Sequence, residues 1–164
     1  MLTHRKIIVV GGSSGIGFAV ASKASQVGAE VVIASRSAEK LEAAVGKLGG
    51  NVYAQVLDAT DEHSTTEFFR HVGSFDHLVI SIKPSIPTGS FLENAMAAVG
   101  AAFDAKFWGQ YRLAKHGAPH IRPNGSITFT SGTASRRSYP GYSAVSAMNA
   151  AVEALCKSVL EDYR

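Results

Sequence analysis

The chain has 164 residues, of which 46% are hydrophobic and 18% are charged, and its formal net charge at pH 7 is +3. This composition is typical of one globular domain with a sizeable core and excludes a largely disordered chain. The basic excess is small and spread along the chain, which favours solvated lysines and arginines over a nucleic-acid-binding surface. No run approaches the roughly eighteen consecutive apolar residues of a membrane-spanning helix, so we expect no membrane partner.

The single cysteine, Cys156, cannot form an internal disulfide, which favours a reducing compartment. The apolar run near the N-terminus is too short for a signal peptide, and we expect a cytoplasmic protein. The six histidines are scattered, and Pro119 separates His116 from His120. Because no Cys/His cluster is present, no metal site is expected.

Short β-branched runs alternate with longer helical patterns along the chain. The expected strands are 6–10, 30–34, 51–57, 77–81 and 126–130. The expected helices are 15–27, 37–48, 61–72, an alanine-rich region ending near 116, and 144–157. Apolar strands that each precede a helix predict a parallel sheet covered on both faces. We therefore expect a single domain over 1–164 with a doubly wound α/β fold in three α/β/α layers.

A glycine-rich turn follows the first expected strand. Gly11, Gly15 and Gly17 have the spacing G-x-x-x-G-x-G. Gly11 permits a sharp turn, Gly15 lets the backbone approach a pyrophosphate, and Gly17 lets helix and strand pack closely. The N–H groups at the helix start then face an anion, so the turn predicts dinucleotide binding. No Gly-Lys-Ser/Thr sequence follows, which argues against a phosphate loop of the nucleotide-hydrolysing kind.

The second expected strand ends in Ser35, Arg36 and Ser37. An acidic residue there would accept hydrogen bonds from the adenosine ribose, whereas a guanidinium and two hydroxyls suit a 2′-phosphate. The sequence therefore predicts NADP(H) in preference to NAD(H). The alternative is that Arg36 is an ordinary exposed residue.

Together these features resemble the short-chain dehydrogenase/reductase family. The similarity extends over all 164 residues. Its motifs are GGSSGIG (11–17), VLDATD (56–61), HLVIS (77–81), GSITFTSG (125–132) and AAVEALCKSV (150–159). The resemblance implies a Rossmann-type fold and hydride transfer between a nicotinamide and a small carbonyl or alcohol substrate.

The predicted cofactor-binding residues follow the first four strands, and the resemblance implies that Asp58 and Ala59 lie at the adenine. The full set is Gly11, Ser13, Ser14, Gly15, Ile16, Gly17, Ser35, Arg36, Ser37, Asp58, Ala59, Ser81, Ile82 and Lys83. The chain departs from the family pattern at two of these turns. Val10 stands where a threonine usually precedes the first glycine, and Ser81, Ile82 and Lys83 replace an asparagine-rich segment.

The active site of the family uses an asparagine, a serine, a tyrosine and a lysine, and none of the four is at its usual position here. Alignment on AAVEAL (150–155) places Val145 at the tyrosine and Asn149 at the lysine. The same alignment places Gly132 at the serine and Lys106 at the asparagine.

A rival register places Tyr142 at the tyrosine and Ser146 at the lysine. It keeps a phenol, but it breaks the agreement at AAVEAL and moves the serine position to Phe129. We prefer the first register.

In the preferred register lysine and asparagine have exchanged places, so Lys106 is expected to keep a cation near the nicotinamide ribose from the opposite helix. Ser131, beside Gly132, offers a hydroxyl, and Tyr142 or Tyr139 offers a phenol. The candidate catalytic residues are Lys106, Ser131, Tyr142 and Asn149. The alternative is that Lys106 is a surface lysine and Tyr142 a packing residue.

The resemblance also implies a homodimer or homotetramer formed through the two long helices that flank the fifth strand. Arg136 and Arg137 offer charge for an anionic substrate, although such a pair is more often solvated. Family members usually continue through two more strands and a substrate-covering segment, so we expect a truncated form of a longer protein. Two other functions stay open: a non-catalytic NADP(H)-binding protein, and a subunit whose main role is assembly.

Overall fold

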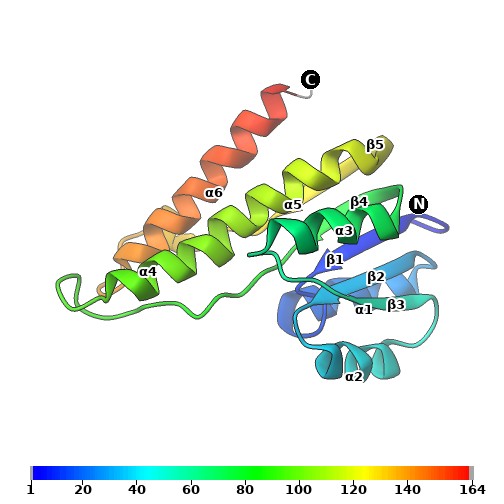
Figure 1. Cartoon of the computed structure of the whole chain (residues 1–164), viewed down its shortest axis with the longest axis horizontal. Helices are drawn as coiled ribbons and strands as arrows, with labels where there is room; N and C mark the ends of the chain where they lie inside the picture. The colour runs from blue at the N-terminus through cyan, green and yellow to red at the C-terminus, as the bar shows by residue number, and fades with distance from the viewer. Residues whose placement is uncertain (1, 163–164) are drawn as a thin grey trace. The chain divides into compact units, whose positions relative to one another are not determined.

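The computed structural model describes residues 2–162 and divides into two compact units (Figure 1). The first unit contains residues 2–81 and 112–128, and the second contains residues 82–111 and 129–162. Within residues 2–162, no helix is both long enough and apolar enough to cross a membrane.

A five-stranded sheet has the strand order β3-β2-β1-β4-β5. The strands are β1 (Lys6–Val10), β2 (Glu30–Ser35), β3 (Val52–Val56), β4 (Phe75–Ile80) and β5 (Ile121–Phe129). β1 pairs in parallel with both β2 and β4, and β2 pairs in parallel with β3. The strand order reverses between β1 and β4, and ligands of such sheets bind beside the carboxyl ends of the strands at that point. The predicted doubly wound fold is confirmed.

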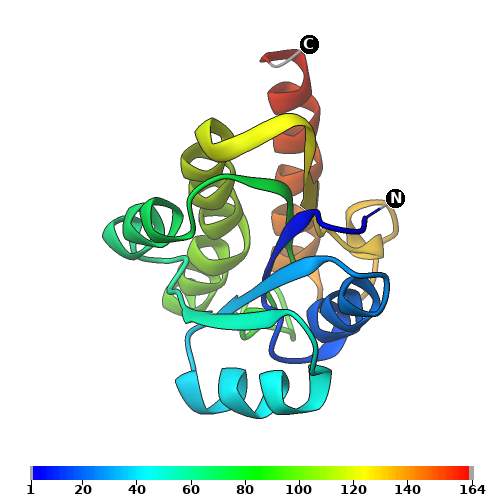
Figure 2. The ribbon, with the colours of Figure 1, turned by 90° about the vertical axis from the view of Figure 1, so that its right-hand side faces the viewer.

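Helices cover both faces of this sheet in the first unit (Figure 2). α1 (Gly15–Gln26) and α2 (Ala38–Leu48) pack on a cluster that includes Val9, Val31 and Ile33. α3 (Glu62–Val72) lies on the other face and buries Phe68 and Phe69. Because both faces of the central strands are buried, their sequences are continuous apolar runs rather than alternating ones.

The expected ends of α2 and α3 are confirmed to within one residue. Ser37 caps α2 by accepting a hydrogen bond from the N–H of Lys40, and Asp61 caps α3 by accepting from His63 and Ser64. Both helices end at a glycine with positive φ, Gly49 and Gly73 in turn. These N-caps and C-terminal glycines are common helix start and stop signals.

The fifth strand begins at Ile121, five residues before the expected start. The segment Pro123–Gly125 predicts a strand end, but β5 is the last strand in the sheet order, and an edge strand tolerates a missing N–H. Asn124 takes a left-handed conformation with φ 64°. A Cβ at Gly125 would lie 2.3 Å from the carbonyl oxygen of Asp76, so only glycine fits there.

Asp76 joins the amino ends of three strands in the first unit. Its side chain is 2% exposed and accepts hydrogen bonds from the Arg5 guanidinium (2.6 Å), the Lys6 N–H (2.8 Å) and the Arg122 guanidinium (2.9 Å). Burial acts to raise the pKa of this carboxyl, but these donors and the charge of Arg122 outweigh it and lower the pKa from 3.8 to about 2. The carboxylate therefore remains ionised in the fold.

The second unit contains one long interrupted helix and one continuous helix. α4 (Met96–Phe103) leads into a π-helical turn, η1 (Asp104–Trp108), and then into α5 (Gly109–Gly117), which runs on into the first unit. After a short turn, η3 (Thr133–Ser135), α6 (Ser143–Asp162) runs beside α4 in the same direction (Figures 1 and 2). Ala102 and Phe103 of α4 pack with Val145 and Met148 of α6 and with Ala134 of η3.

The π-helical turn was not predicted from the sequence, and Gln110 explains how it is held. The Gln110 side chain is fully buried and donates to the Lys106 carbonyl at 2.9 Å. The same carboxamide donates to the Thr130 carbonyl (3.1 Å) and accepts from the Thr130 N–H (3.1 Å). Gln110 therefore ties the widened turn to the segment that follows β5. A short η2 turn (Ala118–His120) connects α5 to β5.

We predict that Asp76→Asn lowers the free energy of unfolding by roughly 2–3 kcal/mol at pH 7, because three donors lose an anionic acceptor. Since the pKa is lowered in the fold, this stabilisation is present above about pH 4 and is lost as the pH falls toward 2. Urea denaturation at several pH values measures both effects. Glu67→Gln, which breaks an exposed pair with Arg70, is the control and is expected to leave the midpoint unchanged. Equal midpoints for Asp76→Asn and wild type would contradict the prediction.

We predict that Gln110→Leu lowers the free energy of unfolding by roughly 2–4 kcal/mol, because polar backbone groups of Lys106 and Thr130 lose this buried partner while the volume is kept. Urea denaturation measures the change. Gln26→Ala is the control, since the exposed Gln26 side chain donates to the Ser22 hydroxyl on its own helix. An unfolding curve like that of wild type for Gln110→Leu would contradict the prediction.

Candidate functional site

The glycine turn after β1 has the backbone geometry that its spacing predicts. Gly11 and Gly15 have φ of 84° and 55°, and the Gly11 N–H donates to the Ala34 carbonyl at 2.7 Å. A Cβ at Gly17 would lie 2.2 Å from the carbonyl oxygen of Gly11, so a side chain there cannot be accommodated. A Cβ at Gly15 would meet nothing within 4 Å. The turn thus packs α1 closely on β1 and leaves the backbone at Gly15 open.

The amino end of α1 has no side-chain cap. Ser14 is the N-cap residue, but its hydroxyl accepts no hydrogen bond from the helix, and the first turn has no acidic residue. Ser13 is half-buried, Ser14 is exposed, and Ile16 is 67% exposed beside them. Backbone N–H groups and the positive end of the helix dipole are therefore directed toward an open surface, where an anion is stabilised.

The residues after β2 provide polar groups at the carboxyl end of the parallel strands, where the glycine turn also lies. The Oγ of Ser35 is buried and has no hydrogen-bond partner within residues 2–162. Arg36 is exposed, and Ser37 uses its oxygen to accept from the N–H of Lys40 at 3.2 Å. An unpartnered buried hydroxyl beside a guanidinium fits a ligand that brings its own hydrogen-bonding groups.

Asp58 and Ala59 follow β3. The Asp58 carboxylate accepts from the Thr60 N–H (2.9 Å) and the Thr60 hydroxyl (2.7 Å). Burial acts to raise the pKa of Asp58, but the Thr60 hydrogen bonds and the charges of Arg36 and Arg112 lower it below the usual value. Arg112 also donates to the Ala59 carbonyl at 3.3 Å, which holds this turn in place.

The turn after β4 contains the last three predicted cofactor residues. The Ser81 N–H donates to the Val10 carbonyl at 2.8 Å, which places Ser81 beside the carboxyl end of β1. Ile82 is half-buried and Lys83 is exposed at the start of the second unit. The uncapped helix, the open glycine and the unpartnered Ser35 hydroxyl together fit a phosphorylated dinucleotide.

The second unit contains the four candidate catalytic residues. Lys106 lies on η1, is half-buried, and its ammonium has no hydrogen-bond or ion-pair partner within residues 2–162. Burial lowers the pKa of Lys106. Asn149 on α6 is 5% exposed, and its carboxamide also has no hydrogen-bond partner among the described residues. Its Nδ2 lies 2.9 Å from the position that a Cβ of Gly132 would take.

Ser131 is bound into a network that was not predicted. Its hydroxyl lies 3.1 Å from the Asn149 carbonyl and 3.0 Å from the Glu153 carboxylate. Glu153 also accepts from the Ser135 hydroxyl at 2.5 Å and from the Arg136 guanidinium at 3.3 Å. Hydrogen bonds from Ser135 and Ser131, with the charge of Arg136, lower the pKa of Glu153. The only sequence signal for Glu153 is its place one helical turn after Asn149.

Tyr142 lies just before α6. Its side chain is 41% exposed, and its ring lies 5.7 Å from the ring of Tyr139. Val145, which the preferred register places at the tyrosine of the family, is 7% exposed and packs in the apolar cluster between α4 and α6. The buried position on this helix face therefore has no proton donor, and the phenols are more exposed.

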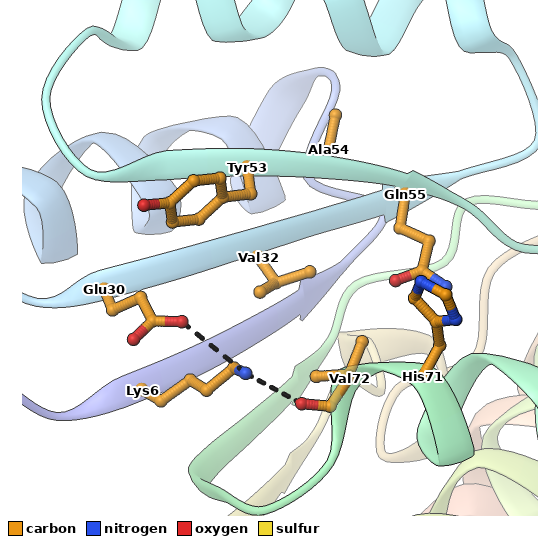
Figure 3. A pocket seen from close by; sticks show the side chains of 8 residues that line it. All are labelled: Lys6, Glu30, Val32, Tyr53, Ala54, Gln55, His71 and Val72. Carbon is orange, nitrogen blue, oxygen red and sulfur yellow. Dashed lines mark hydrogen bonds and ion pairs between the residues drawn. The ribbon is translucent and has the colours of Figure 1, made fainter.

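A cavity of about 270 Å³ lies in the first unit, and none of the predicted site residues lines it (Figure 3). Lys6 and Glu30, at the amino ends of β1 and β2, line it with Tyr53, Gln55 and His71. The Lys6 ammonium pairs with Glu30 at 3.5 Å and donates to the Val72 carbonyl at 2.8 Å. Among residues 2–162, no group of three or more His, Cys, Asp or Glu side chains is arranged to hold a metal ion.

Comparisons with known proteins agree with the fold and the glycine turn. The family model described as enoyl-(acyl carrier protein) reductase matches residues 10–164. The 1-deoxy-11-beta-hydroxypentalenate dehydrogenase of Streptomyces avermitilis is 29% identical over 140 residues, which cover 80% of this chain and 52% of the relative. The short-chain dehydrogenase/reductase fsr5 of Gibberella fujikuroi is 31% identical over 147 residues, which cover 80% of this chain and 56% of the relative. The chain thus spans little more than half the length of these curated relatives.

Solved structures give the same result. A short chain dehydrogenase/reductase family protein has a TM-score of 0.92 at 29% identity, covering 98% of this chain and 69% of its own. A small-chain dehydrogenase in complex with NADPH has a TM-score of 0.78 at 32% identity, and the match covers 97% of this chain and 65% of that structure's chain. Since the family model matches nearly the whole chain, the chain belongs to the short-chain dehydrogenase/reductase family.

Proposed function

We propose that the protein is an NADP(H)-dependent oxidoreductase that acts on a small carbonyl or alcohol. The observation that carries the proposal is the amino end of α1, where an uncapped helix follows a glycine turn with an open backbone at Gly15. Such an end binds the pyrophosphate of a dinucleotide. Relatives named as dehydrogenases and reductases support the reaction class.

The preference for NADP(H) follows from Ser35, Arg36 and Ser37. The Arg36 guanidinium pairs with a 2′-phosphate, and the free Ser35 hydroxyl donates to the same ribose or phosphate. Asp58 and Ala59 bind the adenine end, where Arg112 holds the turn. One similar structure contains NADPH, which supports a phosphorylated cofactor without excluding NAD(H).

The catalytic residues of the proposal are Lys106, Ser131, Tyr142 and Asn149. Nicotinamide supplies the hydride when it is bound. Lys106 supplies a cation from η1, Asn149 an amide from α6, and Tyr142 a phenol at the start of α6. Ser131 acts through Glu153 and fixes the segment after β5, because its hydroxyl is already hydrogen-bonded.

Self-association through the long helices is also part of the proposal. Phe107, Trp108 and Tyr111 form an aromatic cluster, with Trp108 and Phe107 centroids 4.7 Å apart and Trp108 and Tyr111 centroids 5.8 Å apart. Trp108 and Tyr111 are 48% and 41% exposed. Exposed aromatic groups of this kind are typical of protein interfaces and support a homodimer or homotetramer.

A second function is favoured by one observation. In the preferred register Val145 and Gly132 stand at the positions of the family's tyrosine and serine, and Val145 is buried. A chain that binds NADP(H) without turnover, as a cofactor sensor or an assembly subunit, also fits this arrangement.

We predict that Arg36→Ala weakens NADPH binding by 10- to 100-fold and leaves NADH binding unchanged, because only NADPH has the 2′-phosphate that a guanidinium pairs with. Fluorescence titration of the reduced nucleotides measures both affinities. Lys40→Ala, which removes a nearby exposed charge on α2, is the matched control. Equal losses for NADPH and NADH, or no loss, would contradict the role of Arg36.

We predict that the protein oxidises NADPH in the presence of at least one member of a panel of ketones, aldehydes and enones. Absorbance at the reduced-nicotinamide band measures turnover, and product analysis identifies the reduced carbon. NADPH binding without turnover on the whole panel would favour the non-catalytic function. Failure to bind either nucleotide would contradict the proposed function altogether.

A further inference from the structure

The cavity of the first unit lies at the opposite end of β1 from the glycine turn (Figure 3). Lys6 and Glu30 line it at the amino ends of β1 and β2, whereas the turn follows Val10, about 13 Å further along the strand. We propose that this cavity binds a neutral, planar nitrogen heterocycle with two adjacent N–H donors on one edge, as guanine has. The inference goes beyond the proposed function and does not depend on it.

The cavity forms where α3 leaves part of its own sheet face uncovered. Val32 and Tyr53 are partners in the β2–β3 register, so their side chains point to the same face of the sheet. That face is the one on which α3 lies, because the neighbouring residues of Val32 pack in the cluster of α1 and α2. Val32 is 6% exposed, but Tyr53 is 56% exposed beside it. The sheet therefore offers an apolar floor with an open aromatic ring next to it.

Polar groups lie at both ends of this floor. Glu30 precedes Val32 by two residues, and Gln55 pairs with Ala34, so Glu30 and Gln55 begin about 13 Å apart along the strands. In Figure 3 the Gln55 carboxamide and the His71 ring point toward one another at one end, and the Glu30 carboxylate lies at the other. A volume of about 270 Å³ is just below that of pockets for drug-sized ligands, which suits a single heterocycle.

The groups at the two ends have unused hydrogen-bonding capacity. In the described part of the chain, 2–162, neither the Gln55 carboxamide nor the His71 ring has a hydrogen-bond partner. The Glu30 carboxylate pairs with the Lys6 ammonium at 3.5 Å and accepts no hydrogen bond from another described residue. A carboxylate only accepts hydrogen bonds, and its two oxygens pair best with two adjacent donors. A ligand that fits this end therefore presents paired N–H groups.

The charges that line the cavity favour a ligand without net charge. The Lys6 ammonium and the Glu30 carboxylate cancel one another, and Lys6 is also held by the Val72 carbonyl at 2.8 Å. An anionic ligand at this end would be repelled by Glu30, and a cationic one by Lys6. The ligand therefore binds through hydrogen bonds and ring contacts rather than through an ion pair.

The Tyr53 ring provides a surface for a planar ligand. Its hydroxyl donates to the Asn51 side-chain oxygen at 2.7 Å, which holds the ring in place. Bases stack on exposed aromatic rings of this kind. A guanine ring stacked there directs its N1–H and N2–H groups to Glu30, and its N7 accepts from the Gln55 carboxamide or the His71 ring. Adenine has no such pair of adjacent donors and fits the Glu30 end less well.

Titration calorimetry of the full chain with guanosine tests the inference. Guanosine is expected to bind at one site, and 1-methylguanosine, in which one of the two donors is blocked, is expected to bind at least tenfold more weakly. Saturation with NADPH is expected to change the guanosine affinity less than twofold, because the cavity lies away from the glycine turn. Loss of guanosine binding in NADPH would place guanosine in the cofactor site and overturn the inference, as would the absence of saturable binding.

Variants of the lining residues locate the bound guanosine. Glu30→Gln is expected to weaken its binding at least tenfold and Tyr53→Ala at least fivefold, whereas Tyr53→Phe keeps the ring and stays within twofold of wild type. Glu42→Gln and Gln26→Ala change exposed side chains of α2 and α1 and are the controls, with unchanged affinity. Circular dichroism checks that each variant keeps the fold.

Wild-type affinity in both Glu30→Gln and Tyr53→Ala would overturn the inference, and so would equal losses in the control variants. Failure of wild type to bind NADPH would overturn the proposed function alone, because guanosine binding is also measured without the cofactor.

Discussion

The close approach of Gly17 to the Gly11 carbonyl is the constraint on which the first unit depends. A Cβ at residue 17 would overlap that oxygen, so the absence of a side chain is what allows α1 to begin directly against β1. The start of α1 in turn directs its uncapped N–H groups beyond the carboxyl ends of β1 and β2. The phosphate-binding geometry therefore comes from backbone packing, and the side chains of the turn add little to it.

The sheet and its helices could be predicted from the sequence because the signals that specify them, apolar runs and helix caps, lie within single segments. Residues 7–10 and 31–34 are uninterrupted apolar runs, and burial on both faces is the simplest reason for such runs. Ser37 and Asp61 are strong N-caps, so α2 and α3 begin within one residue of the expected positions. The early start of β5 was missed because Pro123, Asn124 and Gly125 usually end a strand. Here β5 is the last strand in the sheet order, and Gly125 lies against the Asp76 carbonyl, which is distant in sequence.

The second unit was harder to predict because its decisive contacts join separate segments. In the sequence Gln110 is an ordinary helix-forming residue, and its hydrogen bonds to the Thr130 backbone are seen only in the fold. Glu153 likewise belongs to a helix-forming motif, and its contact with Ser131 cannot be read from that motif. The positions of Lys106 and Asn149 followed from a family alignment, but their lack of partners follows only from three-dimensional packing. Sequence patterns thus predicted which residues form the candidate site, whereas the burial and hydrogen bonds of each side chain required the structure.

The close approach of Gly132 to Asn149 couples the two positions. In the register that aligns AAVEAL (150–155) with the family pattern, residue 132 would be a serine and residue 149 a lysine. The Asn149 nitrogen lies 2.9 Å from the position of a Cβ at residue 132, so a side chain added there moves the flexible end of the Asn149 side chain. Substitutions at the two positions are therefore expected to be non-additive, so the effect of either change depends on which residue stands at the other.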